Sequence, residues 1–433
     1  MRFDHSDRLR TKSHALIPGG CHAYAKADSE YPQLSPGFIT RGQGCHVWDV
    51  DGNEFIEYAP GNRSVSLGHA YRPVVEAITN ELQRGVNFTR PAEIEVRAAE
   101  KLLSVLTNAE MVKFCKNGSD ATTAAIRLAR AATGRDLVAC CADHPFFAFD
   151  DWFIATTPHS CGIPETTKSL TLTFRYNDID SVKTLFESYK KQIACLILEP
   201  ARHEEPQDDF LSDLKQICRD HGTLLVFDEM ITGFRWHLRG GQAVYGVDPD
   251  LACWGKAMAN GFSISALTGK RRYMELGDLS TQPNNLFLLS TTHGAETHSL
   301  AAMMATLDAY TTLPVIDTLY KQGRRLAEGF RRLVAEHHLG HAIDVIGRPC
   351  CLSYHTKDCS GHYSPLLRAL FLQETIRRGI LMSSFVVTYS HSDSDIDQTL
   401  AAIDGALGVY AKALREGTEK YLQGPSPRPI YRR

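Results

Sequence analysis

The chain has 433 residues, of which 43% are apolar and 22% charged, and a formal net charge of −3. This length exceeds one hydrophobic core, so we expect one large domain and one smaller domain. The small net charge argues against nucleic acid and against an anionic membrane surface as partners, and no apolar run approaches the length needed to span a bilayer.

Twelve cysteines are spread along the chain without the spacing of metal ligands. The adjacent pairs Cys140-Cys141 and Cys350-Cys351 suit neither zinc nor an easy disulfide. We therefore expect reduced, mostly buried thiols, no metal and a cytoplasmic location. Residues 1–10 are charged and lack the apolar core of a signal peptide.

The N-terminal part of the chain predicts a hairpin followed by two helices. Residues 45–58 alternate apolar and polar around Asp51-Gly52, which is typical of a β-hairpin with a type I′ turn. Apolar residues at helical spacing predict helices over 73–82 and 94–106. We assign residues 1–70 to the smaller domain.

The central part, residues 71–310, alternates short apolar runs with helical patterns. The runs predict buried strands at 137–141, 170–174, 193–198 and 223–227. The helical patterns cover 121–132, 181–189, 210–221 and 297–311. Buried strands separated by helices favour an α/β domain with a mainly parallel sheet flanked by helices.

The pattern changes after residue 310 and predicts an α+β domain over residues 311–433. Its expected elements are a charged amphipathic helix at 317–338, a Cys-rich strand region at 349–355, a helix at 364–378, a strand at 380–382 and a helix at 394–415. The tail from residue 424 is expected to be loosely ordered.

An acid and a lysine in the centre of the chain suggest a cofactor site. The apolar run 224–227 leads into Asp228, and Lys256 follows later among apolar residues such as Trp254 and Met258. Pyridoxal 5′-phosphate (PLP) requires such a pair: the lysine forms a Schiff base with the cofactor, and the acid keeps the pyridine nitrogen protonated. Each residue alone has an ordinary alternative, because most lysines are solvated and a strand-end acid often caps the next helix.

Three further motifs accompany this pair. Glu199 follows the buried run 193–198, at a strand end where ligands of open α/β sheets bind. Asn117-Gly118-Ser119-Asp120 opens a helix and is either a phosphate-binding loop or an ordinary helix N-cap. STTHGAE, residues 290–296, follows a strand-like run at 286–289 and is either a second phosphate contact or a turn with an N-cap.

The order of these motifs resembles one enzyme family. NGSDATTAAIRLARAATGR, ILEP, VFDEMITGFR, DPDLACWGK and STTHGAE, preceded by IPGG, WDVDGNEFIEY and LGHAY, are similar to motifs of the class III PLP-dependent aminotransferases, and most of all to the glutamate-1-semialdehyde 2,1-aminomutase-like subgroup. The resemblance extends from about residue 17 to about residue 397. It implies the fold type I of PLP-dependent transferases, with the N- and C-terminal segments joined in the smaller domain, and a homodimer whose sites are shared between subunits.

The resemblance implies a role for each matching residue. Lys256 is the Schiff-base lysine and proton carrier, and Asp228 binds the pyridinium nitrogen. Gly118 and Ser119 bind the cofactor phosphate, and Thr292 reaches the phosphate of the neighbouring subunit. Glu199 lies near the cofactor ring, where the family often places an acid that restricts the substrate.

The sequence departs from the family pattern at the ring and in the substrate pocket. Asp143 occupies the position of the aromatic residue that stacks on the cofactor, so His144 or Phe146 is expected to stack instead. Lys26 replaces a carboxylate-binding arginine, and the pocket tryptophan is replaced near Asn62-Arg63. These polar residues indicate a hydroxylated acceptor such as a sugar or polyol derivative, although a solvated loop is the ordinary alternative.

The expected reaction is transfer of an amino group from an amino acid donor to a carbonyl acceptor. One alternative is an intramolecular 2,1-aminomutase, which uses the same chemistry but keeps its product bound until both carbons have exchanged. A second is a catalytically silent protein that binds the cofactor as a scaffold. A nicotinamide enzyme is disfavoured because no G-x-G-x-x-G motif follows the first strand.

Overall fold

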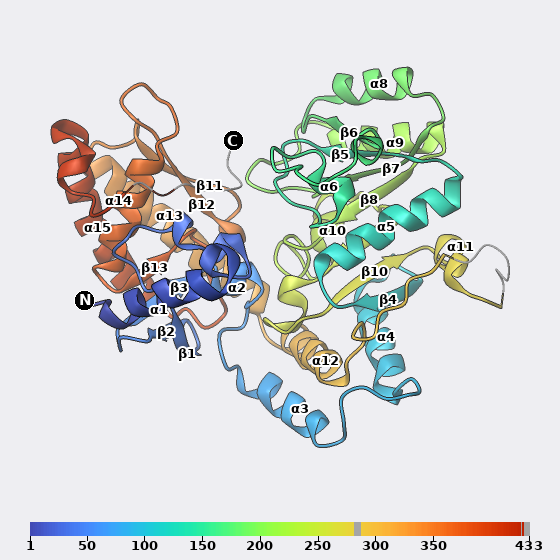
Figure 1. Cartoon of the computed structure of the whole chain (residues 1–433), viewed down its shortest axis with the longest axis horizontal. Coiled ribbons are helices and arrows are strands. Elements are labelled where there is room, and N and C mark those ends of the chain that lie inside the picture. The colour runs from blue at the N-terminus through green and yellow to red at the C-terminus, as the bar shows by residue number, and fades with distance from the viewer. Residues whose placement is uncertain (281–286, 426, 428–433) are drawn as a thin grey trace. The chain divides into compact units, whose positions relative to one another are not determined.

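The computed structural model describes residues 1–280, 287–425 and 427. The chain forms two compact units. The larger unit is the continuous stretch Arg72–Pro314, and the smaller unit joins Met1–Tyr71 with Val315–Arg433 (Figure 1).

A mainly parallel sheet forms the centre of the larger unit, in the order β4-β10-β9-β8-β7-β5-β6. β10 runs antiparallel to both of its neighbours, and the other pairs are parallel. Every residue of β7, β8, β9 and β10 is buried, as expected for strands covered on both faces. The strands are β4 (Met111–Cys115), β5 (Leu137–Cys141), β6 (Thr171–Phe174), β7 (Ile193–Leu198), β8 (Leu224–Asp228), β9 (Leu251–Trp254) and β10 (Ser265–Gly269).

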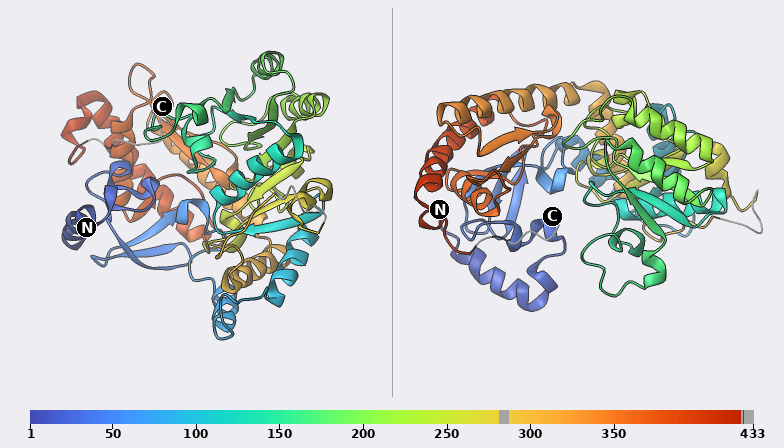
Figure 2. Two further views of the ribbon diagram at one scale, coloured as in Figure 1. Left: turned by 45° about the vertical axis from the view of Figure 1, so that its right-hand side comes forward. Right: turned by 90° about the horizontal axis from the view of Figure 1, so that it is seen from above.

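Helices surround this sheet (Figure 2). α5 packs against β7, β9 and β10, α8 and α9 pack against each other, and α12 packs against α3 and α4. The helices of this unit are α3 (Arg72–Leu82), α4 (Glu93–Val105), α5 (Gly118–Thr133), α6 (Asp151–Ile154), α7 (Glu165–Lys168), α8 (Ile179–Ser188), α9 (Phe210–His221), α10 (Gly240–Tyr245), α11 (Arg271–Met274) and α12 (Thr297–Thr312).

The smaller unit is built from both ends of the chain. β13 (Ile380–Met382) pairs in parallel with β3 (Glu54–Tyr58), which extends the antiparallel strands β1 (Ile39–Gln43) and β2 (His46–Asp49). A second, two-stranded sheet pairs β11 (Ile343–Ile346) with β12 (Ser353–Thr356). The helices are α1 (Asp4–Leu16), α2 (Pro60–Arg63), α13 (Val315–Glu336), α14 (Pro365–Ile376) and α15 (Asp393–Glu416).

Local structure differs from the sequence-based expectation at three places. The hairpin between β2 and β3 does not contain a type I′ turn, because Gly52 has a positive φ but Asp51 does not, and that turn needs two such residues. Cys350 and Cys351 lie in a short 3-10 turn, and the strand begins only at Ser353. Residues 287–289 form no strand, and Leu286, like residues 426 and 428–433 of the tail, lies outside the described residues.

None of the twelve cysteines, all of which lie in the described residues, forms a disulfide, and most of them are buried. No single described helix is long and apolar enough to cross a membrane. The bent pair α12 and α13 meets that criterion together, by length and composition only.

Candidate active site

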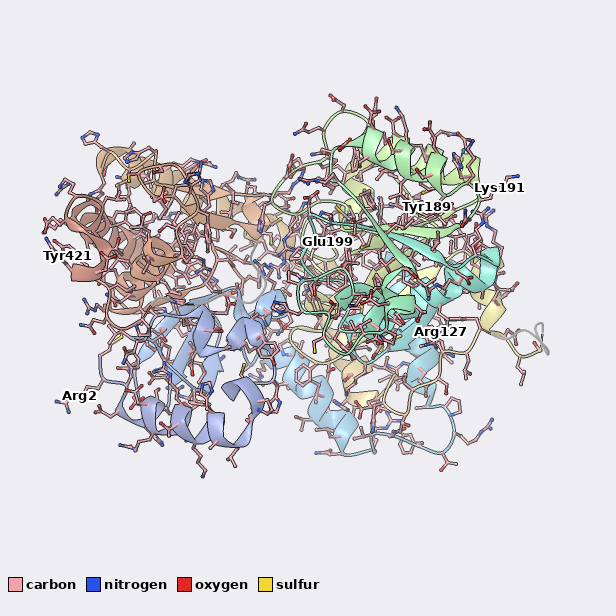
Figure 3. All side chains as sticks on the ribbon, turned by 45° about the horizontal axis from the view of Figure 1, so that its top comes forward. Arg2, Arg127, Tyr189, Lys191, Glu199 and Tyr421 are labelled. Carbon is pink, nitrogen blue, oxygen red and sulfur yellow. The ribbon has the colours of Figure 1, made fainter. Side chains whose placement is uncertain are left out.

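Three polar side chains come from the carboxyl ends of neighbouring strands in the larger unit. Glu199 directly follows β7, Asp228 ends β8, and Lys256 lies just beyond β9. These strands are parallel neighbours, so their carboxyl ends lie at one edge of the sheet, where ligands of such sheets bind. Figure 3 shows Glu199 at this end, whereas Tyr189 and Lys191 mark the amino end of β7.

Asp228 is a buried carboxyl group that is electrostatically linked to both neighbours. It is 3% exposed, and its Oδ1 accepts a hydrogen bond from the Met230 N–H at 2.9 Å. Burial raises the pKa of Asp228, the negative charge of Glu199 raises it further, and the positive charge of Lys256 opposes this shift. A nearby positive charge, such as a protonated ring nitrogen, favours the ionised form of a buried carboxyl group.

Lys256 occupies a backbone conformation that is rare for residues with a side chain. Its φ is 45°, in the left-handed region, which costs such a residue roughly 1–3 kcal/mol and is frequent at active sites. Gly255 precedes it, and a Cβ atom there would lie 2.6 Å from the Met230 sulfur. The next two residues, Ala257 and Met258, are buried. The backbone that carries Lys256 is therefore bordered by apolar side chains.

The N-terminus of α5 combines a helix cap with a close backbone approach. Asn117 Oδ1 accepts hydrogen bonds from the N–H groups of Ser119 at 2.9 Å and Asp120 at 3.3 Å, so the N-cap alternative is realised. The Ser119 hydroxyl accepts from the Phe149 N–H at 3.1 Å, which leaves its own proton able to reach a ligand. A Cβ at Gly118 would lie 3.1 Å from the Met230 sulfur.

His144 and Phe146 lie in the segment after β5 in different surroundings. His144 is buried, its Nδ1 accepts from the Glu199 N–H at 3.1 Å, and its ring lies 5.1 Å from that of Tyr176. Burial lowers the pKa of His144 to about 4, so the ring is neutral at pH 7. Phe146 is 43% exposed. The Asp143 carboxylate is turned to the backbone and accepts from the Tyr176 N–H at 2.8 Å.

Thr292 lies in an exposed loop that leads into α12. Its carbonyl accepts a hydrogen bond from Asn87 Nδ2 at 3.0 Å, and the loop is further anchored by Glu296, which pairs with Lys116 and with His293. The exposed position of Thr292 fits a contact outside its own subunit, which stays a prediction.

The remaining predicted substrate residues belong to the smaller unit. Lys26 is exposed in a short 3-10 turn. Asn62 and Arg63 lie in α2 with φ values of 54° and 75°. That these three residues contact the same substrate as Lys256 therefore stays a prediction.

Sequence reasoning missed two residues of this region, Met230 and Arg202. Met230 packs its sulfur against Gly118 and Gly255 and so couples the start of α5 to the segment carrying Lys256. Arg202 Nη1 lies 3.2 Å from Glu199 Oε1. Its position three residues after a strand-end acid was the available signal.

The residues present fit PLP. The buried carboxyl group of Asp228 suits a protonated pyridine nitrogen, because a positive charge beside it favours its ionised form, and Lys256 supplies an amine at the neighbouring strand end. A buried oxygen of Glu199, Oε2, has no hydrogen-bond partner among the described residues, so it is an acceptor that a bound molecule can satisfy. The start of α5 brings amides and a hydroxyl to a position suited to an anion.

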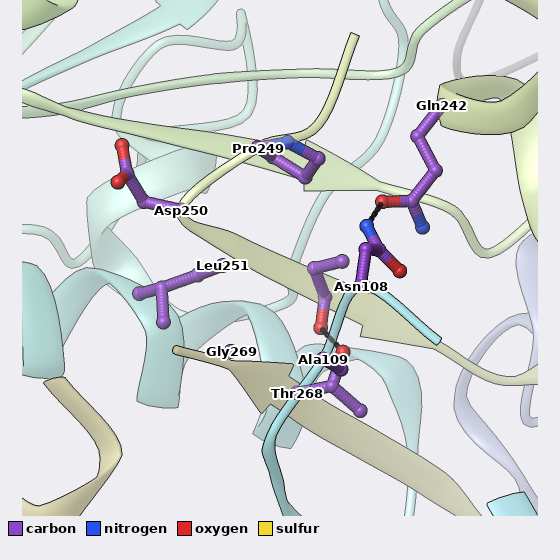
Figure 4. A pocket seen from close by; sticks show the side chains of 9 residues that line it. Asn108, Ala109, Gln242, Pro249, Asp250, Leu251, Thr268 and Gly269 are labelled. Carbon is purple, nitrogen blue, oxygen red and sulfur yellow. Dashed lines mark hydrogen bonds between the residues drawn. The ribbon is translucent and has the colours of Figure 1, made fainter. Parts of the chain in front are cut away.

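A cavity elsewhere in the larger unit is too small for a substrate. It measures about 10 Å³ and is lined by residues including Asn108, Gln242 and Asp250 (Figure 4). It lies where β9 begins, whereas Lys256 follows the end of that strand. Such a volume holds about one water molecule.

The fold and the strand-end residues define a PLP-dependent transferase. The FumI protein of Sphingopyxis sp. MTA144, solved with PLP bound, superposes with a TM-score of 0.87 at 26% identity and covers 99% of both chains. The chain belongs to the class III aminotransferases, whose family pattern it matches over residues 27–407. It is therefore a PLP-dependent enzyme, and the sequence-based predictions of family, fold and cofactor are confirmed.

Two curated relatives carry a more specific name. The chain is 33% identical to the glutamate-1-semialdehyde 2,1-aminomutase of Chloroflexus aggregans (strain MD-66 / DSM 9485), over 94% of this chain and 98% of that protein. It is 32% identical to the enzyme of the same name from Desulfitobacterium hafniense (strain DSM 10664 / DCB-2), over 90% and 94% of the two chains.

Proposed function

We propose that this enzyme moves an amino group from an amino acid donor to a carbonyl acceptor, with Lys256 and Asp228 as its catalytic residues. The observation that carries the proposal is the placement of these two residues at the carboxyl ends of neighbouring parallel strands. PLP, when bound, supplies an electron-withdrawing ring. Asp228 holds the proton at the ring nitrogen, and Lys256 Nζ moves a proton at the substrate carbon.

The other predicted residues serve to bind cofactor and substrate. Gly118 and Ser119 hold the cofactor phosphate, together with Thr292 of the partner subunit in a homodimer. His144 and Phe146 are the proposed ring contacts. The proposed substrate contacts are Glu199, Lys26, Asn62 and Arg63, whose polar character suits a hydroxylated acceptor such as a sugar or polyol derivative. The absence of disulfides among the described cysteines is consistent with a reducing, cytoplasmic location.

The test of the catalytic pair is substitution of Lys256. The purified holoenzyme is mixed with candidate amino acids, and conversion of the cofactor is followed by its visible absorbance. Lys256→Ala is expected to abolish covalent attachment of the cofactor and all turnover. The control is Lys113→Ala, at an exposed position of β4, which should leave both intact. Turnover that survives in Lys256→Ala would show that another group moves the proton.

Asp228→Asn separates attachment of the cofactor from its activation. The variant keeps Lys256, so the cofactor stays attached, but the neutral amide offers no negative charge to a protonated ring nitrogen. We expect kcat to fall by about 10²–10³, the range seen when one preorganised electrostatic contact is lost. An unchanged kcat would remove Asp228 from the catalytic pair.

The alternative function is a 2,1-aminomutase, favoured by the names of the curated relatives. Its test supplies glutamate-1-semialdehyde alone and, separately, an amino acid donor with a carbonyl acceptor. Isomerisation without release of a keto acid supports the aminomutase, and stoichiometric keto acid release supports the aminotransferase. A protein that binds PLP but does neither supports a silent scaffold.

A further inference from the structure

Three side chains that commonly bind metal ions meet in the smaller unit. Cys45 directly precedes β2, His46 begins that strand, and Asp395 lies in the first turn of α15. One ligand atom from each, a sulfur, a ring nitrogen and a carboxylate oxygen, lies within 4.8 Å of the other two. Cys45 and Asp395 are buried, and the side chain of His46 is 32% exposed. The cluster therefore joins two parts of the chain that are 350 residues apart.

The distances within this cluster are close to those between ligands of one small cation. Cys45 Sγ lies 3.5 Å from Asp395 Oδ2, and His46 Nε2 lies 3.1 Å from Asp395 Oδ1. Bonds of about 2.0–2.3 Å to a tetrahedral zinc ion place its ligands roughly 3.3–3.7 Å apart. Zinc binding therefore calls for small side-chain movements and no change of the backbone.

His46 lies between two carboxylate groups. Its Nδ1 is 2.9 Å from Glu54 Oε1, and its Nε2 is 3.1 Å from Asp395 Oδ1. A neutral imidazole carries one N–H, so it can donate to only one of these carboxylates. Donation to Glu54 leaves the lone pair of Nε2 facing the Asp395 oxygen, which a cation between the two would stabilise. A metal-bound histidine usually donates its other N–H to a carboxylate in this way.

Asp395 also has an ordinary role in the cap of α15. Its Oδ2 accepts hydrogen bonds from the Ser392 N–H at 2.7 Å and from the Ser392 hydroxyl at 2.6 Å, which completes a capping box. An ionised carboxylate offers about four acceptor positions on its two oxygens. Capping of the helix by one oxygen is therefore compatible with binding of a metal ion by the other.

We propose that Cys45, His46 and Asp395 bind one zinc ion, with water in the fourth position of the tetrahedron. A thiolate and an imidazole favour zinc over the hard cations magnesium and calcium, which take oxygen ligands. Binding releases the thiol proton to solvent, and the partly exposed His46 gives the ion a way in. The spacing of the cysteines predicted no metal, because spacing along the chain does not register residues that only the fold brings together.

The proposed ion has a structural role. It ties the start of β2 to the start of α15 and so braces the smaller unit across the two ends of the chain. This role is independent of the proposed aminotransferase function, since no step of amino-group transfer uses the three ligands.

The test measures zinc binding by the holoenzyme after dialysis against EDTA. Zinc is titrated in competition with a coloured chelator, and the wild type is expected to bind one equivalent per chain. Glu54→Gln removes only the carboxylate that positions His46, and it should weaken zinc binding by about 10–100-fold. Cys45→Ser and His46→Gln keep polar side chains but remove ligands, so each should weaken binding by more than about 100-fold.

Two further measurements locate the ion. Cobalt(II) in a tetrahedral site with a thiolate ligand gives visible absorption bands, and Cys45→Ser should lose them. Zinc should raise the melting temperature of the wild type, because a ligand of the folded state stabilises that state, and should not raise that of Cys45→Ser. Cys161→Ser removes an exposed cysteine and is the matched control, which should behave as the wild type.

PLP content and the melting temperature without metal are recorded for every variant. Equal PLP content means that zinc held by the cofactor cancels in the comparison. A folding defect in Cys45→Ser would appear in the metal-free melting temperature, and His46→Gln, at a partly exposed position, then decides the question.

Either of two results overturns the proposal. Less than one equivalent of zinc bound by the wild type would make His46 a proton-bearing bridge between Glu54 and Asp395. Equal zinc affinity in the wild type, Cys45→Ser and His46→Gln would place the ion at other side chains.

Discussion

Asp228 and Glu229 are adjacent in sequence but have different surroundings. The charge of Glu199 raises the pKa of Asp228, and the charge of Lys256 lowers it. Glu229 is buried and accepts the N–H groups of Gly241 at 2.7 Å and Gln242 at 2.9 Å, together with the Thr232 hydroxyl. It therefore anchors the start of α10, where an anion is favoured by the helix dipole, and plays a structural role.

The stability of the cofactor-free protein should depend on pH through Glu229. Burial raises the pKa of Glu229 from 4.5 to about 7. Between these values the unfolded state binds fewer protons than the folded state, so the free energy of unfolding falls as pH rises. Glu229→Gln removes this titration. Relative to this variant, the wild type should lose at most about 3 kcal/mol between pH 4.5 and 7.

Urea unfolding of both proteins at pH 5 and pH 8 measures this difference. Glu187→Gln, at an exposed position on α8, is the control and should follow the wild type at both pH values. Parallel pH profiles for the wild type and Glu229→Gln would mean that Glu229 is ionised throughout.

Sequence reasoning identified Asp228 and Lys256 because residue type and position after an apolar run are local properties. It could not separate Asp228 from Glu229 by environment, since that depends on Gly241 and Gln242, which approach only in the fold. Arg202 was missed for a similar reason: an arginine in a loop is ordinary until its partner is known to be buried.

At the scale of elements, the start of α5 is both a capped helix and the proposed phosphate site. Asn117 and Asp120 form a reciprocal capping box, so the two readings of this motif are compatible. The short apolar strands β5 and β7 were found from sequence at their observed positions. β10 was missed, because its residues, SALTG, combine small and polar types that carry little strand signal.

Substitution of Asn117 separates these two roles. Asn117→Ala removes the acceptor for two N–H groups and should cost about 1 kcal/mol of stability, measured by urea unfolding. Asn117→Asp keeps the cap and its stability. Its added negative charge should weaken PLP binding if the cofactor phosphate lies at this terminus. Unaltered PLP affinity in Asn117→Asp would place the phosphate elsewhere.

At the scale of the whole molecule, the smaller unit depends on residues far apart in sequence. Its β3–β13 pairing and one of its cores join the two ends of the chain. That core contains Phe3, Val47, Phe55, Leu372, Ile376 and Leu381. Sequence patterns located the separate strands but could not pair them, because pairing over such a distance leaves no local pattern.

Phe55→Ala tests this dependence. Phe55 is completely buried, and removing its ring should cost about 3–5 kcal/mol. Hydrogen exchange should show that β3 and β13 lose protection together, while β7 and β8 keep theirs. Phe88→Ala, at a position 52% exposed, is the control. Loss of protection in β3 alone would mean that β13 is held by other contacts.

The division of the chain also sets an order for folding during synthesis. The larger unit is one continuous stretch that ends at Pro314, so all of its strands have left the ribosome before β13, the second partner of β3, is made. The first 71 residues must wait, with the edge of β3 unpaired, until Met382 has been added. Unpaired strand edges are prone to aggregation, so slow translation between residues 315 and 382 lengthens the period in which this edge of β3 is exposed to it.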